Sequence, residues 1–466
     1  MSRERRVDGS VSLFLTLTIS VFLALAAVLI ESARENTMLL QAETVLDTSV
    51  NSAMGEYHKV LWEEYGLLFI DCSYKSSQPS YQNLVQHIQA AADQNLGTGT
   101  GWLSMTLTDV NVSSVVLATD DSGTVFYQRG VEAAKADTGV SILEQLLAYM
   151  TTVEELIAQG ETLLGMGSSL DDSIEEANGQ EIEILPEVWG YDEDGNYVLE
   201  QEAEYEQVDI TSPLKTILDT SEEFILGQAA ADLSQVSSLS VDLSEAVSSR
   251  SLAVGQGSFE ADGEVTDRLF FLYYLHTYMG NYRDPDADGN LQYSMEYILA
   301  GKDSDRKNLA AAVSRIFLIR MADNFMAIQQ DTERVAAAEI GAGAVTFLVP
   351  YLQPVMKQAL LLYWSYEDSI EDLQTLLTGG KVQLLKSIEL VDVELSYEQY
   401  LMILLFLTGR ENLSLRTMDL IEMDVRQTDG NKEFRFDACI DSCLIGGIFE
   451  DSAGKTYSTD IELRYY

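Results

Sequence analysis

The sequence contains one short run whose residue types and spacing suit metal binding. Asp284, Asp286 and Asp288 occupy alternate positions and are followed by a glycine. Alternate aspartates bring carboxylate oxygens to one point, and glycine allows the sharp bend that calcium loops need. The twelfth position of such a loop, however, holds a methionine, and Glu296 comes one residue later, where a helix turns it about 100° away. Two interpretations remain: a calcium site formed by Asp284, Asp286 and Asp288, or an acidic turn between two helices.

The other reactive side chains do not form a recognisable catalytic set. The sequence has no G-x-S-x-G elbow, and Gly454-Lys455-Thr456 follows Gly447 at seven residues, whereas a phosphate loop needs about five. The histidines fall on separate predicted helices, at His58, His87 and His276. We therefore predict that the chain is not an enzyme and holds no cofactor besides the calcium considered above.

Three cysteines, Cys72, Cys439 and Cys443, are too few for a disulfide framework. The C-I-D-S-C spacing of the last two differs from a redox C-x-x-C and offers only two ligands to zinc. They are predicted to be small buried hydrophobic residues, or to form one bridge if the segment faces an oxidising space.

A long apolar run near the N-terminus indicates where in the cell the chain is located. Residues 11–30 contain no charge and no proline, and thirteen of the twenty are Leu, Ile, Val or Phe. A helix of that length crosses the roughly 30 Å hydrocarbon layer of a bilayer. The hydroxyls of Ser12, Thr16, Thr18 and Ser20 can bond to carbonyls one turn earlier, so they do not oppose insertion. The run predicts a transmembrane helix.

Charges beside this run predict its orientation. Arg3, Arg5 and Arg6 precede it, whereas Arg34 is the one basic residue soon after it. The positive-inside rule then places the N-terminus in the cytoplasm and the rest of the chain outside the cell membrane. The alternative is a cleaved signal peptide, but the run exceeds the usual 7–15 apolar residues of such peptides.

The helical pattern continues beyond the predicted membrane segment. Apolar residues recur at spacings of three and four from Met38 to Tyr65, and no proline or glycine interrupts the chain until Gly55. We predict one helix from about residue 11 to 64, with its first half in lipid and its second half packed against a globular domain. Thr16, Ser20, Ala24 and Ala27 form a strip of small residues suited to self-association in lipid.

The chain resembles two kinds of known protein in particular stretches of its sequence. The glycine before the apolar run and its exit at E-S-A-R look like the minor pseudopilins of tight-adherence (Tad) pilus systems. More of the chain is similar to an uncharacterised family of membrane-anchored proteins of Gram-positive bacteria, in the stretches GSVSLFLTLTISVFLALAAVLIESAR, YHKVLWEEYGLLFID, MEYILAGKDSDRKNL and TGGKVQLLKS. The first resemblance implies a component of a pilus or secretion assembly. Cleavage after Gly9 would place Phe14 at the fifth position, where type IV pilins have glutamate.

The net charge of the chain limits the kinds of partner that it can bind. The chain has 75 acidic and 28 basic residues and a formal charge of −47. Nucleic acid is excluded because binding phosphates needs clustered Lys and Arg. The expected partners are the membrane and other envelope or pilus-assembly proteins.

The predicted fold class is α+β and predominantly helical, with a long N-terminal transmembrane and stalk helix and a globular extracytoplasmic part containing small antiparallel sheets. Strand formers and turn residues alternate with amphipathic runs along this part. The expected segments are a basic leader (1–10), the membrane helix (11–30), its stalk half (31–66), a mixed α/β segment (67–170), an acidic insertion (171–262), a helical core (263–428) and a C-terminal β segment (429–466).

Three features of the globular part carry specific expectations. The acidic insertion contains a hairpin around Asp194-Gly195-Asn196 and a Ser-rich connector near 235–251. Residues 340–356 lack charge, but their two prolines favour a buried helical hairpin over a second membrane span. A basic patch is predicted either to clamp the acidic segment or to dock a partner, and consists of Lys302, Arg306, Lys307, Arg315 and Arg320.

Three functions follow, in order of preference. The first is a non-enzymatic, single-pass envelope protein that resembles a pseudopilin. The second is a surface hydrolase tethered by the same anchor, and the third is a calcium-dependent adhesion module.

Overall fold

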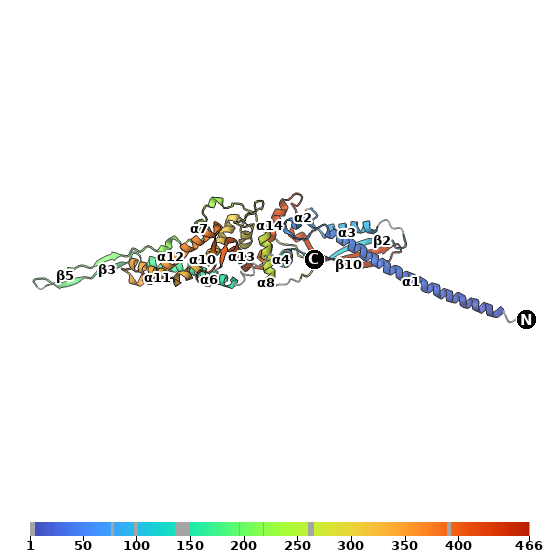
Figure 1. Ribbon diagram of the computed structural model, residues 1–466, viewed down its shortest axis with the longest axis horizontal. Helices are drawn as coiled ribbons and strands as arrows, with labels where there is room; N and C mark the ends of the chain where they lie inside the picture. Colours follow the sequence, from blue (N-terminus) through green and yellow to red (C-terminus); the bar gives the residue numbers. More distant parts are fainter. Residues whose placement is uncertain are drawn as a thin grey trace. The chain divides into compact units, whose positions relative to one another are not determined.

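A computed structural model of the chain describes residues 5–75, 79–96, 101–135, 149–194, 196–217, 219–259, 265–388 and 393–465. It divides into two compact units. Unit 1 comprises residues 1–133, 250–263 and 421–466, and unit 2 comprises residues 134–249 and 264–420. The predicted fold class is confirmed, because helices predominate, the sheets are small and antiparallel, and a long apolar helix precedes the globular part (Figure 1).

Unit 1 is built on a long N-terminal helix, α1 (Arg5–Met54). The helix ends ten residues before the predicted boundary, at the glycine that first weakens the pattern. A turn through Gly55 separates it from α2 (Lys59–Tyr65), whose first turn is capped by His58, since Nδ1 of that ring accepts a bond from the Leu61 amide at 3.4 Å. The predicted stalk, residues 31–66, therefore consists of the second half of α1 and the separate short helix α2.

A four-stranded antiparallel sheet completes unit 1. Its central strand, β9 (Cys439–Asp451), pairs with β1 (Ile70–Asp71), β2 (Met105–Leu117) and β10 (Thr456–Arg464). The alternating pattern of residues 103–119 and the strand formers of the C-terminal segment predict strands; both predictions are confirmed, and the strands belong to one sheet. Two helices complete the unit, α3 (Tyr81–Leu96) and most of α4 (Asp120–Lys135).

Unit 2 is a helical assembly around α10 (Asp305–Gln330), which is buried on most of its circumference. Helices α6 (Met150–Ala177), α7 (Glu222–Ala229), α9 (Ser294–Ala300) and α12 (Gln353–Leu377) pack around it. The remaining helices are α8 (Val265–Tyr278), α11 (Thr332–Val345), α13 (Tyr397–Leu407) and α14 (Arg410–Gln427), whose last residues enter unit 1. The leucine spacing of residues 141–164 predicts a helix there; its first part lies outside the described residues, and α6 continues thirteen residues past its predicted end.

Short 3₁₀ turns and a small two-stranded sheet fill the connections. The turns are η1 (Pro213–Thr216), η2 (Leu233–Gln235), η3 (Pro350–Leu352) and, in unit 1, η4 (Phe436–Ala438). The small sheet joins β7 (Lys381–Gln383) and β8 (Glu394–Ser396).

The acidic insertion forms the predicted hairpin and a longer extension of it. Strands β4 (Val188–Tyr191) and β5 (Tyr197–Gln201) pair around the expected turn, and β3 (Glu181–Leu185) and β6 (Glu204–Gln207) continue the pairing toward α6. The Ser-rich run that follows is not a loose connector. Val247 is buried, and the Ser237 and Ser248 hydroxyls donate hydrogen bonds to Asp305 and Asp419 at 2.5 and 2.6 Å.

The uncharged run 340–356 is a helical hairpin, as the two prolines predict. Helix α11 ends at Val345, η3 begins at Pro350, and Pro354 lies in the first turn of α12. The hairpin is not buried throughout, because Phe347 and Tyr351 at its turn are exposed.

Candidate functional site

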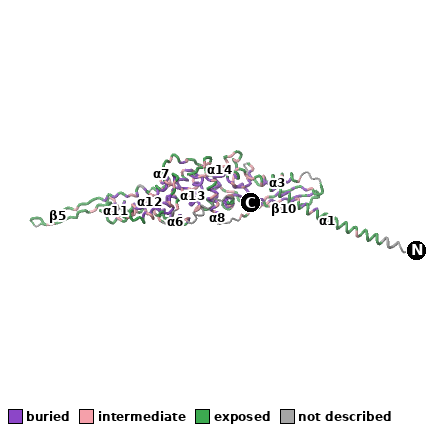
Figure 2. Tube along the Cα trace, in the orientation of Figure 1, coloured by how far each residue is buried: buried purple, intermediate pink, exposed green. Residues whose placement is uncertain are grey.

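The N-terminal part of α1 has an apolar surface that no other described part of the chain covers. The large apolar side chains from Val11 to Ile30 are all exposed (Figure 2). Within the described ranges, α1 is the one helix long and apolar enough to cross a membrane. Burying such a surface in lipid is favourable, because Leu, Ile, Val and Phe each favour insertion by roughly 0.3–0.6 kcal/mol.

Hydroxyl groups within this surface are satisfied by the helix itself. The hydroxyls of Thr16, Thr18 and Ser20 donate to the carbonyls of Ser12, Phe14 and Thr16 at 2.7, 2.9 and 2.6 Å. This confirms the predicted bond to a carbonyl one turn earlier for Thr16, Thr18 and Ser20. Polar atoms in this segment therefore do not need water.

The character of α1 changes at Arg34, the first buried residue from Ser10 onward. Its Nη2 lies 2.7 Å from Oδ2 of Asp451, and its Nε donates to the Trp102 carbonyl at 3.1 Å. Asp451 also accepts the amides of Ala453 and Lys455, both at 2.9 Å. The Lys455 amide and the other donors, Arg34 among them, lower the pKa of Asp451. The arginine thus fixes α1 to the turn between β9 and β10.

Beyond Arg34 one face of α1 packs against the sheet and α3. The buried apolar side chains of this part of the helix are Met38, Ala42, Val45, Leu46, Val50 and Ala53. They meet apolar residues of the strands and of α3, namely Leu107, Ile445, Phe449, Leu463, Leu84 and Ile88. Their spacing of three and four puts them on one face of the helix. One helix therefore has an exposed apolar half and a half that is seated on a sheet.

The loop that contains Asp284, Asp286 and Asp288 connects α8 and α9. The Asp286 carboxylate accepts the amides of Asp288 and Gly289 at 3.2 and 3.1 Å, while Asp284 and Asp288 are exposed. Within the described ranges, no three His, Cys, Asp or Glu side chains are grouped so that they could hold a metal ion. Calcium binding by Asp284, Asp286 and Asp288 stays a prediction.

The carboxylate that would complete such a loop is used elsewhere. Glu296 is fully buried and accepts the Tyr282 amide at 2.9 Å and the Tyr397 hydroxyl at 2.7 Å. Burial outweighs these hydrogen bonds and raises the pKa of Glu296 to about 7. This group organises the interior of unit 2.

The cysteines and histidines have local structural roles. All three thiols are buried and unbonded to each other, and burial raises the pKa of Cys443 to about 12. A thiol with so high a pKa is a poor nucleophile. His87 lies 2.9 Å from Glu56 in unit 1, whereas His276 lies 3.2 Å from Glu398 in unit 2.

Two of the five residues of the basic patch pair with the acidic segment, in line with the first of the two predicted roles, while Lys307 pairs with Asp303 and docking of a partner stays a prediction. Lys302 and Arg306 pair with Glu222 and Glu223 of α7. Arg320 is fully buried and pairs with Asp372 and Asp323 at 2.9 and 3.0 Å, and it also donates to the Gln383 and Leu384 carbonyls. These cations hold unit 2 together.

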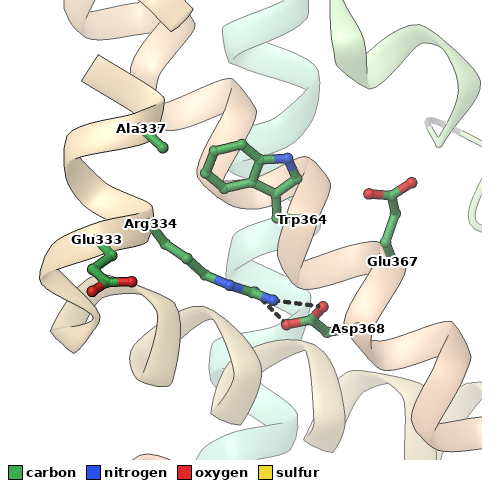
Figure 3. Close-up of a pocket in the computed structure, with 6 residues that line it drawn as sticks. All are labelled: Glu333, Arg334, Ala337, Trp364, Glu367 and Asp368. Carbon is green, nitrogen blue, oxygen red and sulfur yellow. Dashed lines mark hydrogen bonds and ion pairs between the residues drawn. The ribbon is translucent and has the colours of Figure 1, made fainter. Parts of the chain in front are cut away.

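A shallow hollow of about 400 Å³ lies between α11 and α12 (Figure 3). Arg334 of α11 reaches Asp368 of α12, with Nη1 2.6 Å from Oδ2, beside the Trp364 ring. The carboxylates of Glu333 and Glu367 lie at its edges. Since the arginine is already neutralised by Asp368, the hollow offers little attraction to an anionic substrate.

The Arg34–Asp451 pair is the functional contact that the sequence does not predict. The one hint in the sequence is that a lone arginine follows the apolar run. A charge at that position could equally well lie on the surface. No spacing rule connects that arginine with an aspartate 417 residues later.

These features define a class: a protein with a long N-terminal helix, apolar in its first half and packed on an antiparallel sheet in its second, together with a second, helical unit. A family model described as a family of unknown function (DUF5702) matches residues 203–396 and 392–449, which is more than half of the chain. The chain belongs to this family, as its resemblance to an uncharacterised family predicts. Comparisons with curated proteins and with solved structures found no match.

Proposed function

We propose that the protein is a non-enzymatic, single-pass envelope protein that serves a pilus or secretion assembly as a pseudopilin-like subunit. The division of α1 carries the proposal: an exposed apolar half, then a half seated on the sheet of unit 1 from Arg34 onward. A subunit whose helices bundle in the membrane and lift the globular parts outward needs this division.

The arrangement also fits an N-terminus inside the cell. Three arginines precede the apolar half, and the carboxylate-rich bulk follows it. Arg34 pairs with Asp451, and this offsets its positive charge on the side of the membrane proposed to be outer. Orientation is tested with single engineered cysteines, since the native thiols are buried.

For orientation, intact cells stripped of their wall are treated with a membrane-impermeant maleimide. Thr44→Cys, on the exposed face of the seated half, should be labelled on intact cells, and Ser10→Cys only after lysis. The reverse pattern, or mature protein free in the culture medium, would contradict the proposed topology.

Helix bundling is tested by disulfide crosslinking in the membrane. Cysteine at Ser20 or Ala24, in the strip of small residues, should crosslink two copies or a copy and an envelope partner. Cysteine at Leu25 or Leu29, on the opposite face by helical spacing, serves as the matched control. Equal crosslinking from both faces would indicate random collision and would count against the proposal.

The assembly role is tested by purifying the detergent-solubilised protein with its neighbours. Pilus or secretion subunits should co-purify with the native chain and be lost when residues 11–30 are exchanged for an unrelated transmembrane helix. Recovery of no such subunit with the native chain would remove the assembly role while leaving the anchor intact.

A further inference from the structure

The β3–β6 ribbon, residues 181–207, is an exposed two-stranded structure of unit 2. Its two paired arms run from Glu181 to Tyr191 and from Tyr197 to Gln207, and they extend away from the helices of the same unit (Figure 1). Almost every described residue of the ribbon is exposed or half-buried (Figure 2). An isolated two-stranded hairpin is marginally stable in water, because it has no second layer to cover it.

One face of the ribbon carries exposed aromatic rings. Trp189, Tyr191 and Tyr197 are 47%, 72% and 61% exposed. Trp189 and Tyr191 are two residues apart and so share a face, and Tyr191 pairs with Tyr197 across the ribbon. The Tyr197 ring stacks on Trp189 with centroids 5.5 Å apart, and it lies 5.2 Å from the Tyr191 ring. The rings are thus held together in water without burial.

The ribbon is also strongly acidic. Residues 181–207 contain ten Asp and Glu and no Lys, Arg or His. The Glu187 carboxylate accepts a bond from the Trp189 indole at 3.2 Å, so negative charge lies directly beside the rings. Aromatic faces attract cations, and neighbouring carboxylates add to that attraction.

The charge decides between occupants of this face. A second copy of the chain would bring ten further negative charges to the same surface, which opposes self-association. Anionic lipid and nucleic acid are repelled for the same reason. Only a cationic partner gains from both the rings and the carboxylates.

We infer that the ribbon docks a basic polypeptide segment of another protein, bound in extended form along the ribbon. Arginine or lysine side chains lie over Trp189, Tyr191 and Tyr197 and pair with the ribbon carboxylates. The outer backbone edges of the two arms supply unpaired N–H and C=O groups for strand addition. This inference rests on unit 2 alone and holds whether or not α1 enters a filament.

The test uses the full chain in non-ionic detergent and a fluorescein-labelled peptide, acetyl-RVRVRVRV-amide, followed by fluorescence anisotropy in 150 mM salt. The peptide alternates arginine with a strand-forming residue, so it presents its charges on one face. Saturable binding is expected, and the triple variant Trp189→Ala, Tyr191→Ala, Tyr197→Ala should weaken it tenfold or more. Neutralising Glu200, Glu202 and Glu204 to glutamine should weaken it similarly.

Each ribbon variant has a matched control in unit 2. Replacing Ile340, Val345 and Phe347 with alanine removes three exposed apolar side chains elsewhere, and replacing Glu154, Glu155 and Glu161 with glutamine removes three exposed charges from α6. Both controls should bind within twofold of the native chain. If the aromatic variant misfolds, a chain with residues 186–203 replaced by Asn-Gly shortens the ribbon and should also lose binding.

Four results would overturn the inference. The first is equal loss of affinity in the ribbon variants and the α6 control, which would mean general charge attraction only. The others are unchanged binding in the ribbon variants, equal binding of acetyl-EVEVEVEV-amide or spermine, and a ribbon-dependent dimer in the absence of peptide.

Discussion

Arg34 and Asp451 are 417 residues apart in the sequence and 2.7 Å apart at Nη2 and Oδ2. The first marks where α1 stops being exposed, and the second lies at the end of β9 with its side chain fully buried. One ion pair therefore joins α1, which carries the candidate membrane span, to the sheet of unit 1. The pair lies where the exposed apolar half of the helix gives way to the half that packs on the sheet.

Replacing Arg34 with methionine should weaken the attachment of α1 to the sheet of unit 1. The change leaves the buried Asp451 carboxylate without its cation, and leaving a buried charge uncompensated is destabilising. We expect a lower melting temperature of unit 1 and faster amide exchange in the β9–β10 turn, measured by hydrogen exchange with mass spectrometry.

The control for Arg34 is the exposed pair of Lys455 with Glu35, which joins the same two elements. Lys455→Met should have a clearly smaller effect, because solvent screens that pair. If both variants destabilise the protein equally, burial of the Arg34–Asp451 pair is not what fixes the helix.

Gly160 of α6 allows a close helix crossing in unit 2. A Cβ at this position would lie 2.4 Å from the Leu318 carbonyl oxygen of α10, so the two helices would have to separate. Gly160→Ala should therefore destabilise the protein by about 1–3 kcal/mol, although alanine favours helix over glycine. Thermal unfolding of the variant measures the effect.

Gly165 in the same helix provides the matched control, because a Cβ there meets nothing within 4 Å. Gly165→Ala should stabilise the protein by up to about 1 kcal/mol. The crossing would not be tight if Gly160→Ala were also stabilising.

Some of this fold follows from local sequence and some does not. The helix beginning at Asp305, the hairpin around Asn196 and the break at Pro350 were predictable, because capping, turn and proline rules act over a few residues. The central position of β9 was not predictable, because its partner β2 lies more than 300 residues earlier. The candidate site divides in the same way. The apolar half of α1 can be recognised in the sequence, whereas the attachment of its other half to the sheet depends on Asp451, which lies far away in the chain.

Arg320 should be essential to the stability of unit 2. The fully buried guanidinium compensates Asp323 and Asp372, and Lys386 also pairs with Asp372, so Arg320→Met leaves the Asp323 carboxylate buried without a cation. Removing one partner of a buried pair costs about 3–5 kcal/mol. Denaturant unfolding should show this loss.

Arg334→Met serves as the control for Arg320, since its pair with Asp368 is partly exposed. Surface pairs contribute about 0–1 kcal/mol, so this variant should unfold nearly as the native chain does. A loss at Arg334 as large as that at Arg320 would show that burial does not decide the effect.

Glu296 should make unit 2 less stable as pH rises. Burial raises the pKa of this carboxyl to about 7 in the folded state, whereas an unfolded glutamate titrates near about 4.3. Between these values the folded chain holds more protons than the unfolded chain, so stability falls as pH increases through that window and stays lower above it.

Glu296→Gln should abolish this dependence, because glutamine keeps an oxygen for the Tyr282 amide and the Tyr397 hydroxyl but has no charge to bury. The variant should exceed the native chain by on the order of 3 kcal/mol at pH 8 and match it more closely at pH 4.5. Glu398→Gln is the control with the opposite sign, since the hydrogen bond from His276 lowers the pKa of Glu398 and stabilises its charged form. A difference between the native chain and Glu296→Gln that stays constant from pH 4.5 to 8 would show that Glu296 does not titrate in this range.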